Sequence, residues 1–242
     1  EDKMALSNDH VSKKFDAELE SLRSRVMQMG GLVETQIHTA VDAFITGDLD
    51  RMEQVIADDH KVNGFEVSID DDCAHIVARR QPTAGDLRMV MAVSKIVTDL
   101  ERVGDEASKI ARQAREVYLR DRLQVPRLTD VRKIGDIGIR MLRDVLDAFA
   151  RLDPVDAARI IREDATVDDH FRGILRQLIT YMMEDPRTIS SALDIIFIAK
   201  SIERIGDHAK NIAENLIYIV KGKDVRHIAI EQLEQEAFAP DR

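Results

Sequence analysis

Apolar residues recur every three or four positions along most of this chain, which is the pattern of amphipathic α-helices. The first such segment carries Leu22, Val26, Met29 and Val33 at these spacings. Five interruptions mark the ends of helices, at Gly47, Pro82, Pro126, Pro154 and Pro186. The pattern and its breaks predict six long helices, at about residues 15–45, 49–80, 86–119, 130–151, 154–183 and 188–220.

The second half of the chain repeats the first. The segment 99–107, Asp-Leu-Glu-Arg-Val-Gly-Asp-Glu-Ala, returns at 201–209 as Ser-Ile-Glu-Arg-Ile-Gly-Asp-His-Ala, an offset of 102 residues. Val-Asp-Ala-Phe at 41–44 returns as Leu-Asp-Ala-Phe at 146–149, an offset of 105. Three helices, repeated, predict an all-α fold of two tandem three-helix bundles with short connections.

The repeat also divides the chain into domains. We place the first bundle at 9–121, the second at 126–221 and a charged carboxyl-terminal tail at 222–242, which we expect to be loose or weakly docked.

Composition and charge narrow the class of protein. Aromatic residues make up only 4% of the 242 residues and there is no Trp, which favours helices over sheets. A net charge of −10 argues against nucleic acid as a partner and against simple electrostatic docking on anionic lipid. No apolar run approaches the roughly 18–20 residues that span a bilayer, and the polar amino terminus does not resemble a secretion signal. We therefore expect a cytoplasmic protein that is not inserted in the membrane.

A single cysteine, Cys73, cannot form an internal disulfide, which suits a reducing compartment. Asp70, Asp71 and Asp72 precede it and oppose formation of a thiolate. We therefore do not expect a catalytic cysteine.

The duplicated motif places two carboxylates on one helical face in each half. Glu101 and Asp105 are four residues apart, as are Glu203 and Asp207, so each pair repels by roughly 0.2–0.5 kcal/mol on an isolated helix. The motifs also carry a glycine inside a helix, which costs about 1 kcal/mol relative to alanine. Close approach of a neighbouring helix, or access for a bound group, would explain the glycine.

Two interpretations of these carboxylates remain open. On a solvated face, nearby lysines (Lys109 beside Asp105, Lys200 beside Glu203, Lys210 beside Asp207) would form ordinary salt bridges. Alternatively, the carboxylates bind a metal ion, since Glu101 has no cationic neighbour one turn away.

Further oxygen-bearing pairs support the metal interpretation, at Asp59 and Asn63 in the first half and at Asp164 and Asp168 in the second. A bundle can bring each beside the motif of its own half. Oxygen ligands without cysteine favour magnesium, manganese, calcium or iron. Polar positions on a surface face are the alternative explanation.

An enzyme on a helical bundle is the rival class. Ferritin-like oxidases use Glu-x-x-His pairs. No glutamate precedes any histidine by three residues here, and only Asp72 and His75 offer a carboxylate at that spacing within a core helix. His208 follows Asp207 and can join a metal site, although a surface histidine is the commoner outcome. No phosphate loop, nucleophile elbow or zinc motif is present.

The duplicated motifs resemble the PhoU family, the phosphate-signalling accessory proteins of bacteria. The resemblance runs from about residue 15 to 227 and includes Phe-Asp-Ala-Glu-Leu-Glu at 15–20, Met-Gly-Gly-Leu-Val-Glu at 29–34, Ala-Arg-Arg-Gln-Pro-Thr-Ala at 78–84, Asp-Val-Leu-Asp-Ala-Phe-Ala at 144–150, Gln-Leu-Ile-Thr-Tyr-Met-Met-Glu-Asp at 177–185 and Val-Lys-Gly-Lys-Asp-Val-Arg-His at 220–227.

The resemblance implies a cytoplasmic regulator rather than an enzyme. PhoU proteins act with the Pst phosphate ABC transporter, whose ATPase is PstB, and with the sensor kinase PhoR, to restrain the phosphate-starvation response. We expect these partners and a homodimer, with a carboxylate-bridged metal-dependent enzyme as the alternative.

Some PhoU proteins bind metal through Glu/Asp-x-x-x-Asp motifs, which implies candidate ligands at Glu101, Asp105, Glu203 and Asp207. We expect iron, manganese, magnesium or zinc and no organic cofactor. Asp99 is replaced by Ser201 in the second half, so the two sites are not identical.

Overall fold

The computed structural model describes residues 2–120 and 128–239, with side chains described for 13–119 and 129–239. Within these ranges the chain forms helices and no strand, which confirms the all-α prediction. The helices are α1 (Asp2–Thr46), α2 (Leu49–Arg80), α3 (Ala84–Arg120), α4 (Leu128–Arg151), α5 (Pro154–Glu184), η1 (Pro186–Thr188), α6 (Ile189–Lys221) and α7 (Ile230–Phe238). The six predicted helices are α1 to α6, and α1 begins earlier than the predicted residue 15. The predicted domain boundary at 121–126 lies outside the described residues.

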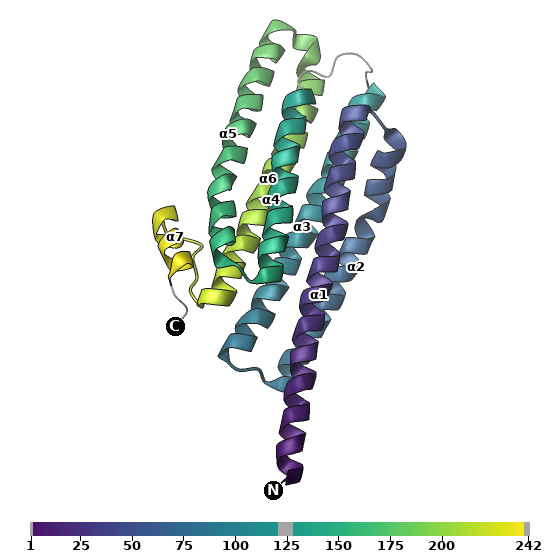
Figure 1. Cartoon of the computed structure of the whole chain (residues 1–242). Coiled ribbons are helices and arrows are strands. Elements are labelled where there is room, and N and C mark those ends of the chain that lie inside the picture. Colours follow the sequence, from purple (N-terminus) through teal and green to yellow (C-terminus); the bar gives the residue numbers. More distant parts are fainter. Residues whose placement is uncertain (1, 121–127, 240–242) are drawn as a thin grey trace.

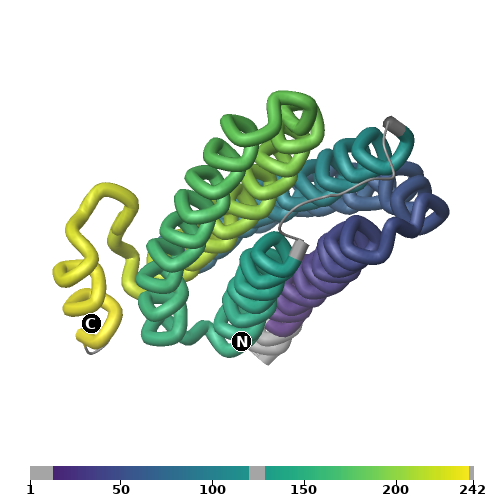
Figure 2. Tube along the Cα trace, turned by 90° about the horizontal axis from the view of Figure 1, so that it is seen from above, coloured from purple at the N-terminus to yellow at the C-terminus, as the bar shows by residue number. Residues whose placement is uncertain are grey.

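The helices form two layers (Figures 1 and 2). Viewed along the helix axes, α1 and α4 lie side by side in one layer, and α5, α6, α3 and α2 follow one another in the second. Each half therefore contributes a three-helix bundle, and the halves meet along α3 and α6 and along α1 and α4 (Figure 1).

The corners between helices repeat as well. Asp48 caps α2, accepting a hydrogen bond from the Arg51 amide, and Asp153, 105 residues later, caps α5. The residue before each cap is in the left-handed region, with φ of 72° at Gly47 and 53° at Leu152. Glycine adopts this conformation freely and leucine does not. The first half therefore carries the residue suited to this corner.

The contact between α1 and α4 has approximate two-fold symmetry. A Cβ atom on Gly30 would lie 2.6 Å from Leu146 Cδ2, and one on Gly135 would lie 2.9 Å from Val41 Cγ1. Gly135 is the repeat of Gly30, and Leu146 is the repeat of Val41, both at the offset of 105. Each helix thus presents a glycine that receives a large side chain of the other, as in an isologous dimer contact.

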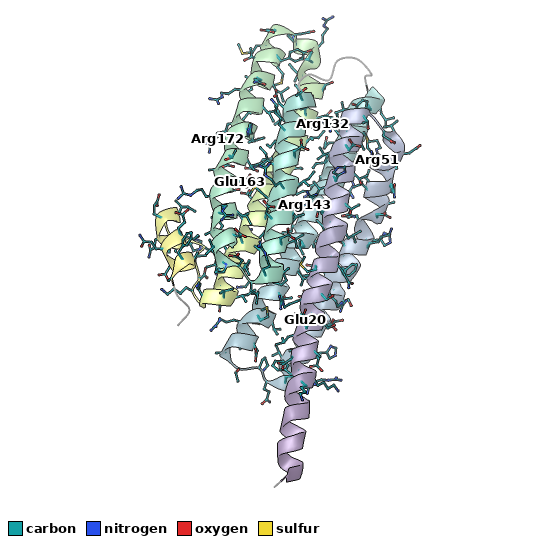
Figure 3. All side chains as sticks on the ribbon, in the orientation of Figure 1. Glu20, Arg51, Arg132, Arg143, Glu163 and Arg172 are labelled. Carbon is teal, nitrogen blue, oxygen red and sulfur yellow. The ribbon has the colours of Figure 1, made fainter. Side chains whose placement is uncertain are left out.

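Charged side chains border this symmetric contact (Figure 3). Arg143 of α4 pairs with Glu34 of α1. At one end of the molecule Arg51 of α2 pairs with Asp42 of α1, and Arg132 of α4 lies 3.7 Å from the same carboxylate. These pairs are partly exposed, so they contribute little to stability and chiefly favour the correct alignment of the helices.

Buried polar groups cross the contact between α3 and α6. His208 Nδ1 lies 2.9 Å from Asp99 Oδ1, and the Asn211 amide donates to the same oxygen at 3.2 Å. His208 is therefore a buried interface residue, and the expectation of a surface histidine is wrong. The carboxylate of its partner Asp99 is replaced by Ser201 in the second half, and His208 itself stands where the first half has Glu106.

The carboxyl-terminal segment is docked rather than loose. Leu233 and Ala237 of α7 are buried, and the Arg162 guanidinium of α5 donates to both oxygens of Glu234 at 2.7 Å. Of the two expected alternatives, loose or weakly docked, the structure shows a docked segment for residues up to 239, because α7 has an apolar face that packs against α5. In the described part of the chain, the first half has no helix that corresponds to α7.

Candidate functional site

Helices α2 and α3 bring four carboxylates together in the first half. Asp59, Glu101 and Asp105 were expected to meet, and each of Asp59 and Glu101 is close enough to Asp105 for its pKa to be affected. Glu66 of α2 joins them, since it interacts with Glu101 and Asp105. We call Asp59, Glu66, Glu101 and Asp105 the first acidic group.

Burial and mutual repulsion dominate the electrostatics of this group. Partial burial raises the pKa of Asp59, Glu66 and Glu101 above the usual values, and neighbouring carboxylates raise it further. A hydrogen bond from Thr98 and the charge of Arg102 oppose the rise at Glu66. Asp59 Oδ1 is fully buried and has no hydrogen-bond partner among the described residues. The charges of Arg112, His60 and Lys109 lower the pKa of Asp59, but burial and the neighbouring carboxylate outweigh them.

Gly104 explains how the helices approach so closely beside this group. A Cβ atom at this position would lie 3.2 Å from Val62 Cγ1 of α2 and 3.4 Å from Gln36 Oε1 of α1. Gly206 plays the same part in the second half, against Val167 and Asp164. The prediction of close helix approach at the motif glycines is confirmed, more strongly for Gly104.

The second half assembles the equivalent set from α5 and α6. Burial raises the pKa of Asp207, and the charges of Glu203, Asp164 and Asp168 raise it further. These four residues, Asp164, Asp168, Glu203 and Asp207, form the second acidic group. A cavity of about 400 Å³ adjoins the group and is lined in part by Asp164, Asp168 and Lys210, so solvent ions can reach it.

Lysines occupy the second group and not the first. Lys210 Nζ lies 3.0 Å from Asp164 Oδ2, and Lys200 Nζ lies 2.6 Å from Glu203 Oε1. In the first half Lys109, expected beside Asp105, instead lies 2.9 Å from Glu106 Oε1. The salt-bridge interpretation therefore describes the second half better than the first.

Two predicted residues lie at the margin of these groups. Asn63 is exposed on α2, and no hydrogen bond joins it to the first group in the described part of the chain. Asp168 is half-buried, and Arg172 Nη2 lies 3.8 Å from its Oδ2. Within the described side chains, no three His, Cys, Asp or Glu residues are placed tightly enough to hold a metal ion as they stand. Metal ligation by any of the eight candidates stays a prediction.

Sequence reasoning missed Glu66. Its signal was present, because Glu66 and Asp70 form another acidic pair four residues apart on α2. Asp70 accepts a hydrogen bond from the Ser94 hydroxyl at 2.7 Å, whereas Glu66 faces the carboxylates of α3. Glu66 has no acidic counterpart in the second half, where Phe171 stands, so the repeat did not reveal it.

A family model described as the PhoU domain matches residues 26–114 and again residues 131–216. The chain belongs to the PhoU family. It is 51% identical over 228 residues to the phosphate-specific transport system accessory protein PhoU of Escherichia coli K12, which covers 94% of each chain. It is 50% identical over 228 residues to the homologue of Pseudomonas aeruginosa, covering 94% of this chain and 93% of that protein.

Solved PhoU structures share the fold. The crystal structure of PhoU from Pseudomonas aeruginosa matches with a TM-score of 0.83 at 49% identity, over 86% of this chain and all of that one. The phosphate transport system regulatory protein PhoU from Streptococcus pneumoniae matches with a TM-score of 0.81 at 28% identity, covering 87% and 99% of the two chains. The two PhoU-domain matches correspond to the two three-helix bundles.

These PhoU relatives are named as accessory or regulatory proteins and not as enzymes. In addition, none of the described helices is both long and apolar enough to span a membrane.

Proposed function

We propose that this protein is a cytoplasmic negative regulator of the phosphate-starvation response. It couples the Pst phosphate transporter, through the ATPase PstB, to a PhoR-type sensor kinase. The observation that carries the proposal is the pair of PhoU domains covering most of the chain, together with relatives named as accessory proteins of phosphate transport. The net charge of the chain is −10 and its sequence carries no catalytic motif, which is consistent with a protein that acts through protein partners.

Regulation by binding requires a difference in affinity. A regulator that binds two states of a kinase equally shifts neither, and a complete switch from 1:99 to 99:1 needs about 5.5 kcal/mol of differential affinity. The regulator therefore binds the kinase state that does not activate transcription more tightly. The two acidic groups supply surfaces that can make this distinction.

Metal binding at the acidic groups is part of the proposal. The residues fit a hard divalent cation in one respect, because Asp59 Oδ1 is buried and has no hydrogen-bond partner among the described residues. Asp59, Glu66, Glu101 and Asp105 would hold the ion in the first half, and Asp164, Asp168, Glu203 and Asp207 in the second. When bound, iron, manganese, magnesium or zinc would neutralise repelling carboxylates and fasten α2 to α3, or α5 to α6.

Reporter measurements in cells test the regulatory role. We expect that a strain lacking this protein expresses a phosphate-starvation reporter in high phosphate, and that the wild-type gene restores repression. Replacing Glu101, Asp105, Glu203 and Asp207 with alanine should release the reporter and remove bound metal. The control is the double variant Asp16→Ala, Glu20→Ala, which removes an exposed acidic pair of α1 outside both groups.

Direct binding tests the partners. The protein should retain the cytoplasmic part of a PhoR-type kinase and PstB on an affinity column, and sedimentation should report a homodimer. If the protein restored repression yet bound neither partner, the proposed coupling would be wrong. Metal-loaded protein should show no phosphatase activity and no oxygen consumption, and activity lost on replacing Glu101 would instead support the alternative enzyme.

A further inference from the structure

Two positions distinguish the acidic groups at the offset of 102 residues. Lys200 of α6 corresponds to Thr98 of α3, and Lys210 corresponds to Ser108. The second half thus carries an ammonium group at two places where the first half carries a hydroxyl group. The surrounding carboxylates are largely conserved between the halves, since Asp59, Glu101 and Asp105 match Asp164, Glu203 and Asp207.

Both lysines are engaged with carboxylates that a metal would need. Lys210 Nζ lies 3.0 Å from Asp164 Oδ2, and Lys200 Nζ lies 2.6 Å and 2.5 Å from the two oxygens of Glu203. The two acceptors are only 6% and 8% exposed, whereas the lysine side chains are 36% and 47% exposed, so each lysine reaches a buried carboxylate from the surface. Lys200 also lies 5.4 Å from the centre of the Phe171 ring, which helps to hold it in place. A cation entering the second group would have to displace or repel two ammonium groups.

Cations act on the first group only from a greater distance, and among the described residues no lysine or arginine forms an ion pair with its carboxylates. Lys109 pairs with Glu106, and no ion pair joins Arg102 or Arg112 to the group among the described residues. Asp59 Oδ1 and the Ser108 hydroxyl are buried without hydrogen-bond partners there. The first group therefore combines carboxylates with buried polar atoms that make no hydrogen bond among the described residues.

Gln36 of α1 is a further buried polar side chain beside the motif. Its side chain is 5% exposed, neither amide atom has a hydrogen-bond partner within the described residues, and its Oε1 faces Gly104 of the motif. Buried amides are normally paired with protein, water or an ion. The counterpart of Gln36 in the second half is Met141, which is fully buried and needs no partner. In the second group the described residues include one buried oxygen without a hydrogen bond, Glu203 Oε2, and Lys200 Nζ lies 2.5 Å from it, whereas no ion pair reaches Asp59 Oδ1 or the Gln36 amide.

We propose that the two acidic groups have different roles: the first takes up a divalent cation from solution, and in the second Lys200 and Lys210 stand permanently in its place. The inference rests on the metal binding proposed above and assigns it to one half. A divalent ion can bind several carboxylates and water at once, whereas each ammonium group neutralises a single charge. The carboxylates of the second group are then neutralised by lysines of the chain itself, and metal binds only to the first group.

Measuring bound Mn²⁺ by elemental mass spectrometry, after chelator treatment and dialysis against Mn²⁺, tests the assignment. Glu101→Ala should remove the bound Mn²⁺, and Glu203→Ala should leave it unchanged. The double variant Lys200→Thr, Lys210→Ser should gain Mn²⁺ that is lost again when Glu203→Ala is added. Lys133→Ser, on α4 and away from both groups, controls for loss of a lysine.

The reverse substitution gives a second measurement. Thr98→Lys places an ammonium group three residues before Glu101, as Lys200 stands before Glu203. Because Thr98 is only half-buried, we expect the variant to fold, which circular dichroism checks. Its affinity for Mn²⁺ in the first group should fall about 10–100-fold, the range seen when groups around a metal site are changed.

The outcomes separate this inference from the proposed function. Equal loss of Mn²⁺ from Glu101→Ala and Glu203→Ala, or loss from Glu203→Ala alone, would overturn the assignment while leaving metal binding intact. Failure of the double lysine variant to gain Mn²⁺ would overturn the role given to the lysines. Absence of Mn²⁺ from every protein, including the wild type, would overturn both metal binding and its assignment, without bearing on the regulatory role.

Discussion

The partners that single side chains contact in this protein depend on how the helices pack against one another. In the salt-bridge interpretation Lys109 neutralises Asp105, but it pairs with Glu106, which Arg204 of α6 also approaches to 3.3 Å. His208 was expected at the surface but lies in the interior, 2.9 Å from Asp99 of α3. Both sequence arguments considered only positions on the same helix. The partners chosen across helices depend on how α3 and α6 meet, which local spacing does not contain.

Cys73 illustrates a residue whose chemistry could be predicted. Burial, with the charges of Asp70 and Asp72, raises the pKa of its thiol to about 12. At pH 8 the thiolate is therefore scarce, and we expect iodoacetamide to label native Cys73 far more slowly than a free cysteine. Labelling in denaturant should be rapid, which serves as the control. Equally fast labelling of the native protein, followed by mass spectrometry, would show that the thiol is accessible.

At the scale of elements, glycine decides how closely the helices approach. Gly30 of α1 faces Leu146, whereas its neighbour Gly31 is exposed and an added Cβ would meet nothing within 4 Å. Both glycines looked alike in the sequence, as a Gly-Gly pair inside a helical pattern. Only the position of α4 distinguishes them.

The two glycines should respond oppositely to alanine. Gly31→Ala should stabilise the protein by up to about 1 kcal/mol through helix propensity. Gly30→Ala gains the same propensity but crowds Leu146, and overpacking typically costs about 1–3 kcal/mol. The free energy of unfolding measured in urea should therefore be lower for Gly30→Ala than for Gly31→Ala by about 1–3 kcal/mol. Equal stabilities would mean that Leu146 moves aside freely.

At the scale of the whole molecule, the halves share an interior. Asp99, His208 and Asn211 are hydrogen-bonded across α3 and α6, and Arg204 of α6 lies 3.3 Å from Glu106 Oε1 of α3. The repeated sequence predicted two bundles, but it did not show that charged groups would be buried between them. The two bundles are therefore expected to unfold together.

Removing Asp99 tests this expectation. Asp99→Ala leaves His208 and Asn211 without their buried acceptor, so the free energy of unfolding should fall by about 1–3 kcal/mol. Thermal unfolding followed by circular dichroism should still show one transition, because both halves lose the same contact. Asp136→Ala, at an exposed position of α4, should change stability by no more than about 0.5 kcal/mol. Two separate transitions in the wild type would show that the halves are independent.

The sequence by itself determined the six long helices, the breaks between them, the repeat and which three helices belong to each half. It could do so because periodicity, Gly, Pro and capping aspartates act locally. It also named most of the carboxylates that meet at the candidate site. Only the tertiary structure decided that Glu66 joins the first group, that Lys210 reaches Asp164 and that α7 packs on α5. These features depend on side chains from different helices and on which apolar faces are left to cover. Such contacts are set by packing in three dimensions, where residues distant in sequence become neighbours.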